Sequence, residues 1–263
     1  MNLTVEGVKL HYEMAGTREA PPLLLVHGFP LSSAMWEPMM QSLRNDFRIF
    51  APDLRGLGRS EASDEMSMAS YVDDCVRVLD AAGEKRSVVV AGMSMGGYIA
   101  FEFFRRARSR MAALILIDTR GNADTDDAAR GRLATAQKVL VEGSAVVADA
   151  MVGNLFAPSS PPDLAEHWRG MMGRSNPRGV AAALKALARR PDSTATYSKI
   201  DVPTLIIVGE NDTITPPADS RNMNSAIPGS RLVIIPEAGH MAAVERPQQV
   251  GGAVAAFMST LHT

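Results

Sequence analysis

Short apolar runs alternate along this chain with longer segments in which apolar residues recur every three or four positions. The short runs are rich in β-branched residues and poor in charge, which is typical of strands buried on both faces of a parallel sheet. They predict strands at residues 9–14, 23–27, 48–52, 87–93, 112–118, 204–209 and 231–236. The longer segments predict amphipathic helices at residues 67–82, 95–107, 218–226 and 248–261. This alternation predicts an α/β fold, a mostly parallel central sheet with helices on both faces.

Residues 120–198 interrupt the alternation. They contain no convincing strand and are typical of about four short helices, separated by Gly143, a proline-rich run at 158–162 and the pair Asn176-Pro177. A helical block between two sheet strands is most simply a cap over the carboxyl ends of the strands. We therefore expect a core of residues 1–119 and 199–263 with a small helical cap at residues 120–198.

The most specific motif is Gly-Met-Ser-Met-Gly at residues 92–96, between an expected strand and an expected helix. The pattern G-x-S-x-G in this context is typical of a nucleophile elbow. Gly92 and Gly96 lack the side chains that would clash where the chain reverses. The turn projects the Ser94 hydroxyl above the sheet, where a helix N-terminus favours developing negative charge. We expect Ser94 to be a nucleophile.

A serine hydroxyl is a poor nucleophile unless a base removes its proton, and the base needs an acid to hold its tautomer. His240 follows the last expected strand and Asp212 follows the strand before it, where reactive groups gather in an open parallel sheet. The chain order Ser94, Asp212, His240 is the order expected for an elbow of this kind. Asp118, which also follows a strand, competes with Asp212 as the acid, and Glu210 is a weaker candidate.

Other polar residues near the expected site have structural interpretations. His27 ends an early strand, and shaping the loop after it is favoured over proton transfer. Asp53 and Arg55 lie in a glycine-rich loop, which we expect to be packed by its own ion pair rather than to contact a substrate. The single cysteine, Cys75, lies on the apolar face of an expected helix and is interpreted as a buried structural thiol.

Five segments together resemble the α/β-hydrolase superfamily. They are His27-Gly28-Phe29-Pro30, Pro52-Asp53-Leu54-Arg55-Gly56-Leu57-Gly58-Arg59-Ser60, Gly92-Met93-Ser94-Met95-Gly96-Gly97-Tyr98, Gly209-Glu210-Asn211-Asp212 and Gly239-His240. The resemblance implies a catalytic triad of Ser94, Asp212 and His240. It also implies an oxyanion hole formed by the backbone N–H groups of Phe29 and Met95.

Within that superfamily the chain is similar to small bacterial carboxylesterases, and also to cofactor-free haloperoxidases or perhydrolases and to enol-lactonases. The resemblance therefore implies a carboxylesterase that acts through an acyl-enzyme. The expected cap has no clear basic face and carries eight large apolar residues that we expect to form its core or line a pocket, namely Met151, Leu155, Phe156, Trp168, Met171, Met172, Leu184 and Leu187, so we expect small, mostly apolar esters. A perhydrolase or enol-lactonase with the same triad is the alternative, and a non-catalytic binding module is a third. Serine at the elbow excludes the aspartate-nucleophile chemistry of related epoxide hydrolases and haloalkane dehalogenases.

The composition of the chain limits the classes of partner and cofactor that we expect. The 263 residues carry a formal net charge of -2, so there is no basic excess to meet the phosphates of a nucleic acid. One cysteine cannot form an internal disulfide, and no metal-binding or dinucleotide-binding motif is present, so neither a metal nor another cofactor is expected. No segment is long enough to span a bilayer. We expect a cytoplasmic enzyme whose partner is a small ester, and the sequence leaves its oligomeric state open.

Overall fold

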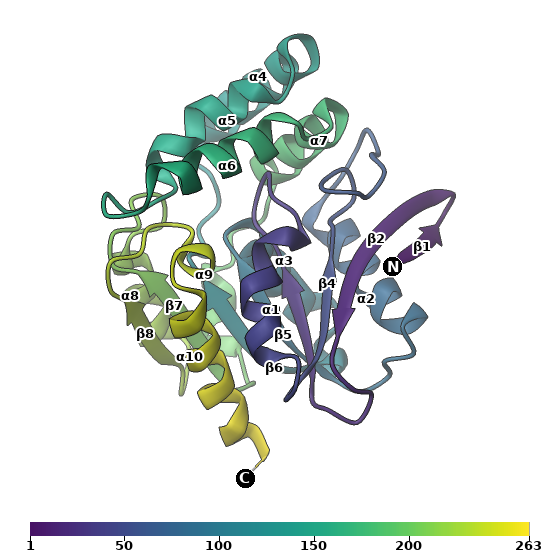
Figure 1. Ribbon diagram of the computed structural model, residues 1–263, viewed down its shortest axis with the longest axis vertical. Helices are drawn as coiled ribbons and strands as arrows, with labels where there is room; N and C mark the ends of the chain where they lie inside the picture. The colour runs from purple at the N-terminus through teal and green to yellow at the C-terminus, as the bar shows by residue number, and fades with distance from the viewer. Residues whose placement is uncertain (263) are drawn as a thin grey trace.

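The computed structural model describes residues 1–262. One eight-stranded sheet runs through the molecule in the order β1-β2-β4-β3-β5-β6-β7-β8 (Figure 1). The strands are β1 (Asn2–Val5), β2 (Val8–Ala15), β3 (Pro22–Val26), β4 (Arg48–Pro52), β5 (Val88–Met93), β6 (Met111–Ile117), β7 (Thr204–Gly209) and β8 (Arg231–Ile235). The six strands from β4 to β8 in this order are parallel, whereas β1 and β2 form an antiparallel extension at one edge.

Helices cover both faces of the sheet, as the sequence predicts. They are α1 (Glu37–Leu43), α2 (Met68–Ala81), α3 (Met95–Arg106), α8 (Pro217–Ala226), α9 (Ala242–Glu245) and α10 (Pro247–Ser259). Successive side chains of a strand point to opposite faces. Leu24 and Val26 of β3 accordingly join the core beneath α2 and α3. Leu23 and Leu25 join the second core, beneath α1 and α10. A strand between two cores must be apolar at every position, which is why these runs are continuous.

Four further helices lie in the chain between β6 and β7, and we call residues 120–198 the cap. They are α4 (Asp126–Glu142), α5 (Ala145–Met151), α6 (Pro162–Gly173) and α7 (Pro177–Ala188). Figure 1 shows them as a layer at the top of the view, beyond one end of the sheet. The cap meets the core closely at Gly179, because a Cβ there would overlap the carbonyl oxygen of Gly56.

The two segments that connect core and cap are tied to each other. Asp124 Oδ1 lies 2.7 Å from Arg190 Nη1, and both side chains are almost fully buried. The Arg190 guanidinium also lies 4.4 Å from the ring centroid of Tyr98 on α3. The N–H of Ser193 donates to the carbonyl of Gly121 over 2.7 Å. The segment that enters the cap and the segment that leaves it are therefore held together at one place on the core, which we call the joint.

The structure corrects the interpretation of the loop after β4. Arg55 does not pair with Asp53; it forms a two-pronged ion pair with Asp74 of α2, at 2.6 and 2.9 Å. Asp53 instead accepts the N–H groups of Ser33, at 2.7 Å, and Arg59, at 2.8 Å, and its Oδ2 lies 3.5 Å from Arg59 Nε, so the ion pair within the loop is between Asp53 and Arg59. The reason is that Asp53 is buried beside those backbone donors, while the Arg55 side chain reaches a buried carboxylate on another element.

Every strand and helix expected from the sequence outside the cap is present. The bounds differ by at most two residues. The structure adds β1, α1 and α9 to that set. Cys75 is fully buried on α2. Over the described part of the chain, every helix is too short or too polar to span a bilayer.

Candidate active site

Three loops at the carboxyl ends of parallel strands bring together Ser94, Asp212 and His240. Ser94 directly follows β5, Asp212 lies in the loop after β7, and His240 lies in the loop after β8. His240 Nε2 lies 2.9 Å from Ser94 Oγ, and His240 Nδ1 lies 2.8 Å from Asp212 Oδ2. Asp212 and His240 are buried, whereas Ser94 is partly exposed. The three side chains thus form one continuous hydrogen-bonded chain that ends at an accessible hydroxyl.

The turn at Ser94 is strained and needs its glycines. Ser94 has φ 52° and ψ -113°, a conformation that costs a non-glycine residue about 1–3 kcal/mol. A Cβ on Gly92 would overlap the carbonyl of Gly96, and a Cβ on Gly96 would overlap the carbonyl of Val26. The hydroxyl of Thr119 donates to the Ser94 carbonyl over 2.8 Å and holds the turn from the neighbouring strand end.

The Asp212 carboxylate accepts four hydrogen bonds. Its Oδ1 accepts the N–H groups of Ile214 and Thr215, at 2.8 and 2.9 Å. Its Oδ2 accepts the Thr215 hydroxyl, at 2.7 Å, and His240 Nδ1, at 2.8 Å. Burial raises the pKa of Asp212, but the hydrogen bond and charge of His240 and the donors of Thr215 outweigh it, so this pKa lies below its ordinary value. An ionised Asp212 holds the proton of His240 on Nδ1, which leaves Nε2 free to accept from Ser94.

The two other candidate acids, Asp118 and Glu210, make different contacts. Asp118 is fully buried, but its oxygens accept the N–H groups of Gly209, at 2.8 Å, and Ala242, at 3.1 Å, and none contacts His240. Burial, followed by the charge of Asp212, raises the pKa of Asp118 well above its ordinary value. Glu210 is exposed and accepts the N–H of Glu237 at 3.2 Å. Asp118 therefore anchors two loops of the site, and Glu210 lies at its outer surface.

The loop after β3 lies against the elbow. A Cβ on Gly28 would be 3.4 Å from the Cβ of Ser94, so the backbone that leads to Phe29 passes directly beside the serine. Met95 is the first residue of α3, and helices leave their first N–H groups without internal acceptors. Within residues 1–262, neither the N–H of Phe29 nor that of Met95 donates a hydrogen bond. Both donors are available to an oxygen atom near Ser94.

His27 is occupied within this loop. Its Nδ1 donates to the carbonyl of Gly28 over 2.8 Å, and its Nε2 accepts the N–H of Leu54 over 2.9 Å. Burial lowers the pKa of His27 below its ordinary value, although the charge of Asp53 opposes the shift. A neutral imidazole with both nitrogens engaged shapes the loop and has no nitrogen left for proton transfer.

The cap contributes both core and accessible side chains. Eight large apolar residues were expected there as pocket or cap core. The structure buries Leu155, Trp168, Met172, Leu184 and Leu187 and leaves Met151, Phe156 and Met171 partly exposed. The last three therefore keep part of their surface accessible.

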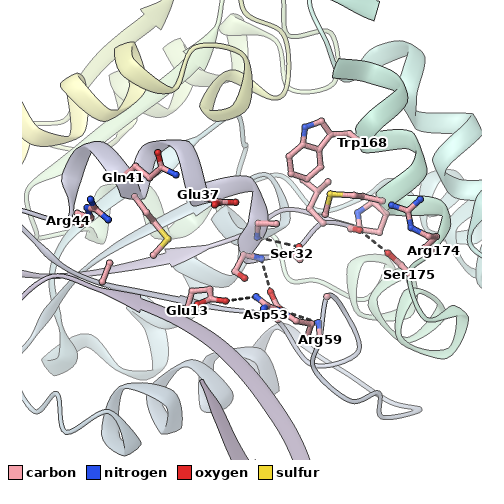
Figure 2. Close-up of a pocket in the computed structure, with 18 residues that line it drawn as sticks. Glu13, Ser32, Glu37, Gln41, Arg44, Asp53, Arg59, Trp168, Arg174 and Ser175 are labelled. Atoms are coloured by element: carbon pink, nitrogen blue, oxygen red, sulfur yellow. Dashed lines mark hydrogen bonds and ion pairs between the residues drawn. The ribbon is translucent and has the colours of Figure 1, made fainter. Parts of the chain in front are cut away.

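A separate groove of about 750 Å³ lies between the cap and α1 (Figure 2). Figure 2 shows Trp168 and Arg174 on its cap side and Gln41 and Arg44 on its α1 side. None of Ser94, Asp212 and His240 lines this groove, although it continues from the loop that contains Phe29 through its neighbour Pro30. Among residues 1–262, no three His, Cys, Asp or Glu side chains are placed together to hold a metal ion.

Three residues at the site were not anticipated. Thr215 binds Asp212, Thr119 binds the carbonyl of Ser94, and Glu245 accepts the N–H of Gly239, next to His240. Threonine and glutamate are common in loops and short helices, and no local pattern distinguishes these three. Only contacts between distant strand ends reveal them.

The fold and the strand-end site define a protein of the α/β-hydrolase class, and comparison with known proteins agrees. The family model for the alpha/beta hydrolase fold matches residues 21–247, so the chain belongs to this family. The resemblance seen in the sequence is confirmed.

Its relatives include esterases. The chain is 31% identical to a bifunctional esterase/perhydrolase of Acinetobacter calcoaceticus over 81% of this chain and 82% of the relative. It is 25% identical to 3-oxoadipate enol-lactonase 1 of Acinetobacter baylyi, over 93% and 91%. Among solved structures it is similar to a thermophilic esterase of Thermogutta terrifontis, solved with malate bound, with a TM-score of 0.95 and 38% identity over 100% and 97% of the two chains.

Proposed function

We propose that this protein is a serine carboxylesterase that cleaves small, mostly apolar esters through an acyl-enzyme. The observation that carries the proposal is the hydrogen-bonded chain from Ser94 Oγ through His240 to Asp212, with links of 2.9 and 2.8 Å. Nucleophile, base and orienting acid in this relation perform acyl transfer on many unrelated folds. Esterase-type relatives support the reaction class.

In the proposed reaction, Ser94 Oγ bonds to the ester carbonyl carbon while His240 Nε2 takes its proton. The N–H groups of Phe29 and Met95 hold the resulting oxyanion, a contribution worth about 10²–10³ in kcat for each donor. Protonated His240 then gives its proton to the departing alcohol, and acyl-Ser94 remains. Water, deprotonated by the same imidazole, attacks the acyl carbon and releases the carboxylic acid and free Ser94. Asp212 keeps the proton of His240 on Nδ1 and stabilises the imidazolium.

The substrate class is proposed from the apolar, partly exposed side chains of the cap. Phe156 lies on the cap segment that packs against Gly239, next to His240, and thioethers such as that of Met151 adapt to acyl groups of different shape. Esters with a short or medium apolar acyl group match this lining. A series of p-nitrophenyl esters from acetate to palmitate tests the class, and the proposal expects kcat/KM to be highest for the shorter members.

Ser94→Ala tests the mechanism. We expect the variant to lose about 10⁶ in kcat on p-nitrophenyl acetate and to escape labelling by a fluorophosphonate probe, while its thermal unfolding stays close to that of the parent. Hydrolysis that persists unchanged in Ser94→Ala would eliminate the covalent mechanism. Absence of both hydrolysis and labelling in the parent protein would instead favour a non-catalytic binding module.

A second candidate is perhydrolysis, in which hydrogen peroxide in place of water takes the acyl group from Ser94. The 31% identical relative with both esterase and perhydrolase activity favours it. The two candidates use the same residues, so they differ only in the acceptor of the acyl group. Acetate-dependent bromination in hydrogen peroxide, compared with hydrolysis of p-nitrophenyl acetate, separates them. Peroxide turnover that exceeds hydrolysis by orders of magnitude would make this protein a perhydrolase.

A further inference from the structure

The loop that carries His240 is anchored on both sides of the imidazole. Before it, the N–H of Gly239 donates to Glu245 Oε1 over 2.8 Å. After it, the N–H of Met241 donates to the carbonyl of Leu155 over 3.1 Å. Leu155 belongs to the cap, so one anchor of the histidine loop is the cap backbone itself.

Glu245 forms a second connection to the same part of the cap. Its other oxygen, Oε2, accepts the N–H of Ala157 at 2.8 Å and the hydroxyl of Ser160 at 2.6 Å. One carboxylate therefore holds the histidine loop with Oε1 and the cap with Oε2. The Glu245 side chain comes from α9, which belongs to neither of the two segments that it joins.

The Glu245 carboxylate bridges the two segments through hydrogen bonds rather than through an ion pair. The residue is 8% exposed, and within residues 1–262 no arginine, lysine or histidine nitrogen lies within 4.0 Å of its carboxylate. Its charge is met by three donors, two backbone N–H groups and one hydroxyl. Hydrogen bonds to an ionised acceptor are stronger than hydrogen bonds between neutral groups, so Glu245 binds both the histidine loop and the cap segment strongly.

Close packing reinforces the bridge. A Cβ on Gly239 would lie 2.6 Å from the nitrogen of Ala157 and 2.7 Å from the carbonyl carbon of Phe156. The cap segment thus rests directly on the backbone next to His240, with no space between them for a side chain. Movement of either segment must displace the other.

We propose that Glu245 is a positioning residue that couples the seating of cap residues 155–160 to the placement of the His240 imidazole. This inference rests on the proposed function, in which His240 is the base. A misplacement of about 1 Å in a catalytic group can cost about 10² in rate, so the 2.9 Å contact between His240 and Ser94 forms fully only when this segment is seated.

Glu245→Gln tests the coupling with nearly unchanged shape. Glutamine keeps one acceptor oxygen, and its amide NH₂ must face either the N–H of Gly239 or the donors of the cap, so one side of the bridge breaks. We expect kcat on p-nitrophenyl acetate, and the rate of fluorophosphonate labelling of Ser94, to fall about 10- to 100-fold, while KM changes less than about threefold.

Two further variants separate positioning from general stability. Val254→Ala, on α10, is the matched control, because it truncates a fully buried apolar side chain that takes no part in the hydrogen bonds of the bridge. At a temperature well below unfolding, it should keep parental kcat. Ser160→Ala removes one donor from the cap side only, and it should lower kcat about threefold. It also keeps the test valid if Glu245→Gln does not fold.

Amide hydrogen exchange gives a readout that does not depend on catalysis. In Glu245→Gln, peptides covering residues 155–160 and 239–242 should gain exchange together, and in Val254→Ala neither should. Equal kcat in Glu245→Gln and Val254→Ala, or faster exchange in only one of the two segments, would overturn the coupling. If the parent shows no Ser94-dependent hydrolysis, the proposed function fails, and the coupling is then decided by exchange alone.

Discussion

Asp212→Asn replaces one carboxylate oxygen with an amide group, and the structure dictates which one. Oδ1 accepts two backbone N–H groups, from Ile214 and Thr215, so the amide oxygen must take that position. The NH₂ group is then forced to the position of Oδ2, where it faces His240 Nδ1. Two donors cannot face each other, so the imidazole must place its proton on Nε2. In that tautomer His240 cannot accept the proton of Ser94.

The expected loss follows from this tautomer change. The same substitution in a well-studied serine protease lowers kcat by about 10⁴. Because the two backbone donors here leave the amide no alternative orientation, we expect a loss of about 10³–10⁴ for Asp212→Asn, or about 4–5 kcal/mol of transition-state stabilisation. The assay is kcat on p-nitrophenyl acetate near pH 7.5, with thermal unfolding measured in parallel.

Asp118→Asn is the matched control. Its carboxylate lies at the same edge of the sheet and is equally buried, yet it contacts only the N–H groups of Gly209 and Ala242. We expect it to lower stability by about 1–3 kcal/mol and kcat by less than about tenfold. A larger loss of kcat in Asp118→Asn than in Asp212→Asn would refute the assignment of the acid.

Other variants test further parts of the site and fold. Thr215→Val removes the hydroxyl that donates to Asp212 and should lower kcat about three- to tenfold, with Thr215→Ser close to the parent. Gly96→Ala sets a Cβ against a strand carbonyl and should lower the urea-measured free energy of unfolding by about 3 kcal/mol or more. Hydrogen bonds from Arg86 hold the pKa of Glu84 at about 2. Its contribution, about 3 kcal/mol, is complete above the unfolded pKa of about 4.3 and lost as the pH falls toward 2, so Glu84→Gln should flatten the acid dependence of stability.

The sequence was sufficient wherever the determinant is local. The apolar run before Ser94 and the glycines two residues on either side of it specify a strand, a tight turn and a helix within a dozen residues. The glycines occur there because a Cβ would overlap neighbouring backbone, a constraint that remains visible in the motif. The same holds for the buried strands, whose continuous apolar character follows from having a core on each face.

The sequence was insufficient wherever the partner of a residue lies on a distant element. Nothing near Arg55 indicates that its carboxylate is Asp74 rather than Asp53. Asp118 and Asp212 both follow strands, and local sequence does not reveal that the Asp118 backbone, at φ 43°, directs its carboxylate toward other loops. Glu245 lies 88 positions along the chain from Ala157 and 85 from Ser160, so only the folded chain reveals the bridge between them.

The joint between Asp124 and Arg190 has a consequence for recombining this protein with others of its family. Asp124 and Arg190 lie near the two ends of the cap, and Arg190 also contacts Tyr98 of the core, so a chimera that receives a foreign cap should be spliced between residues 125 and 189. Such a splice retains both halves of the ion pair in the host. A splice that keeps only Asp124 or only Arg190 in the host would bury one charge without its counterpart, at a cost of about 3–5 kcal/mol.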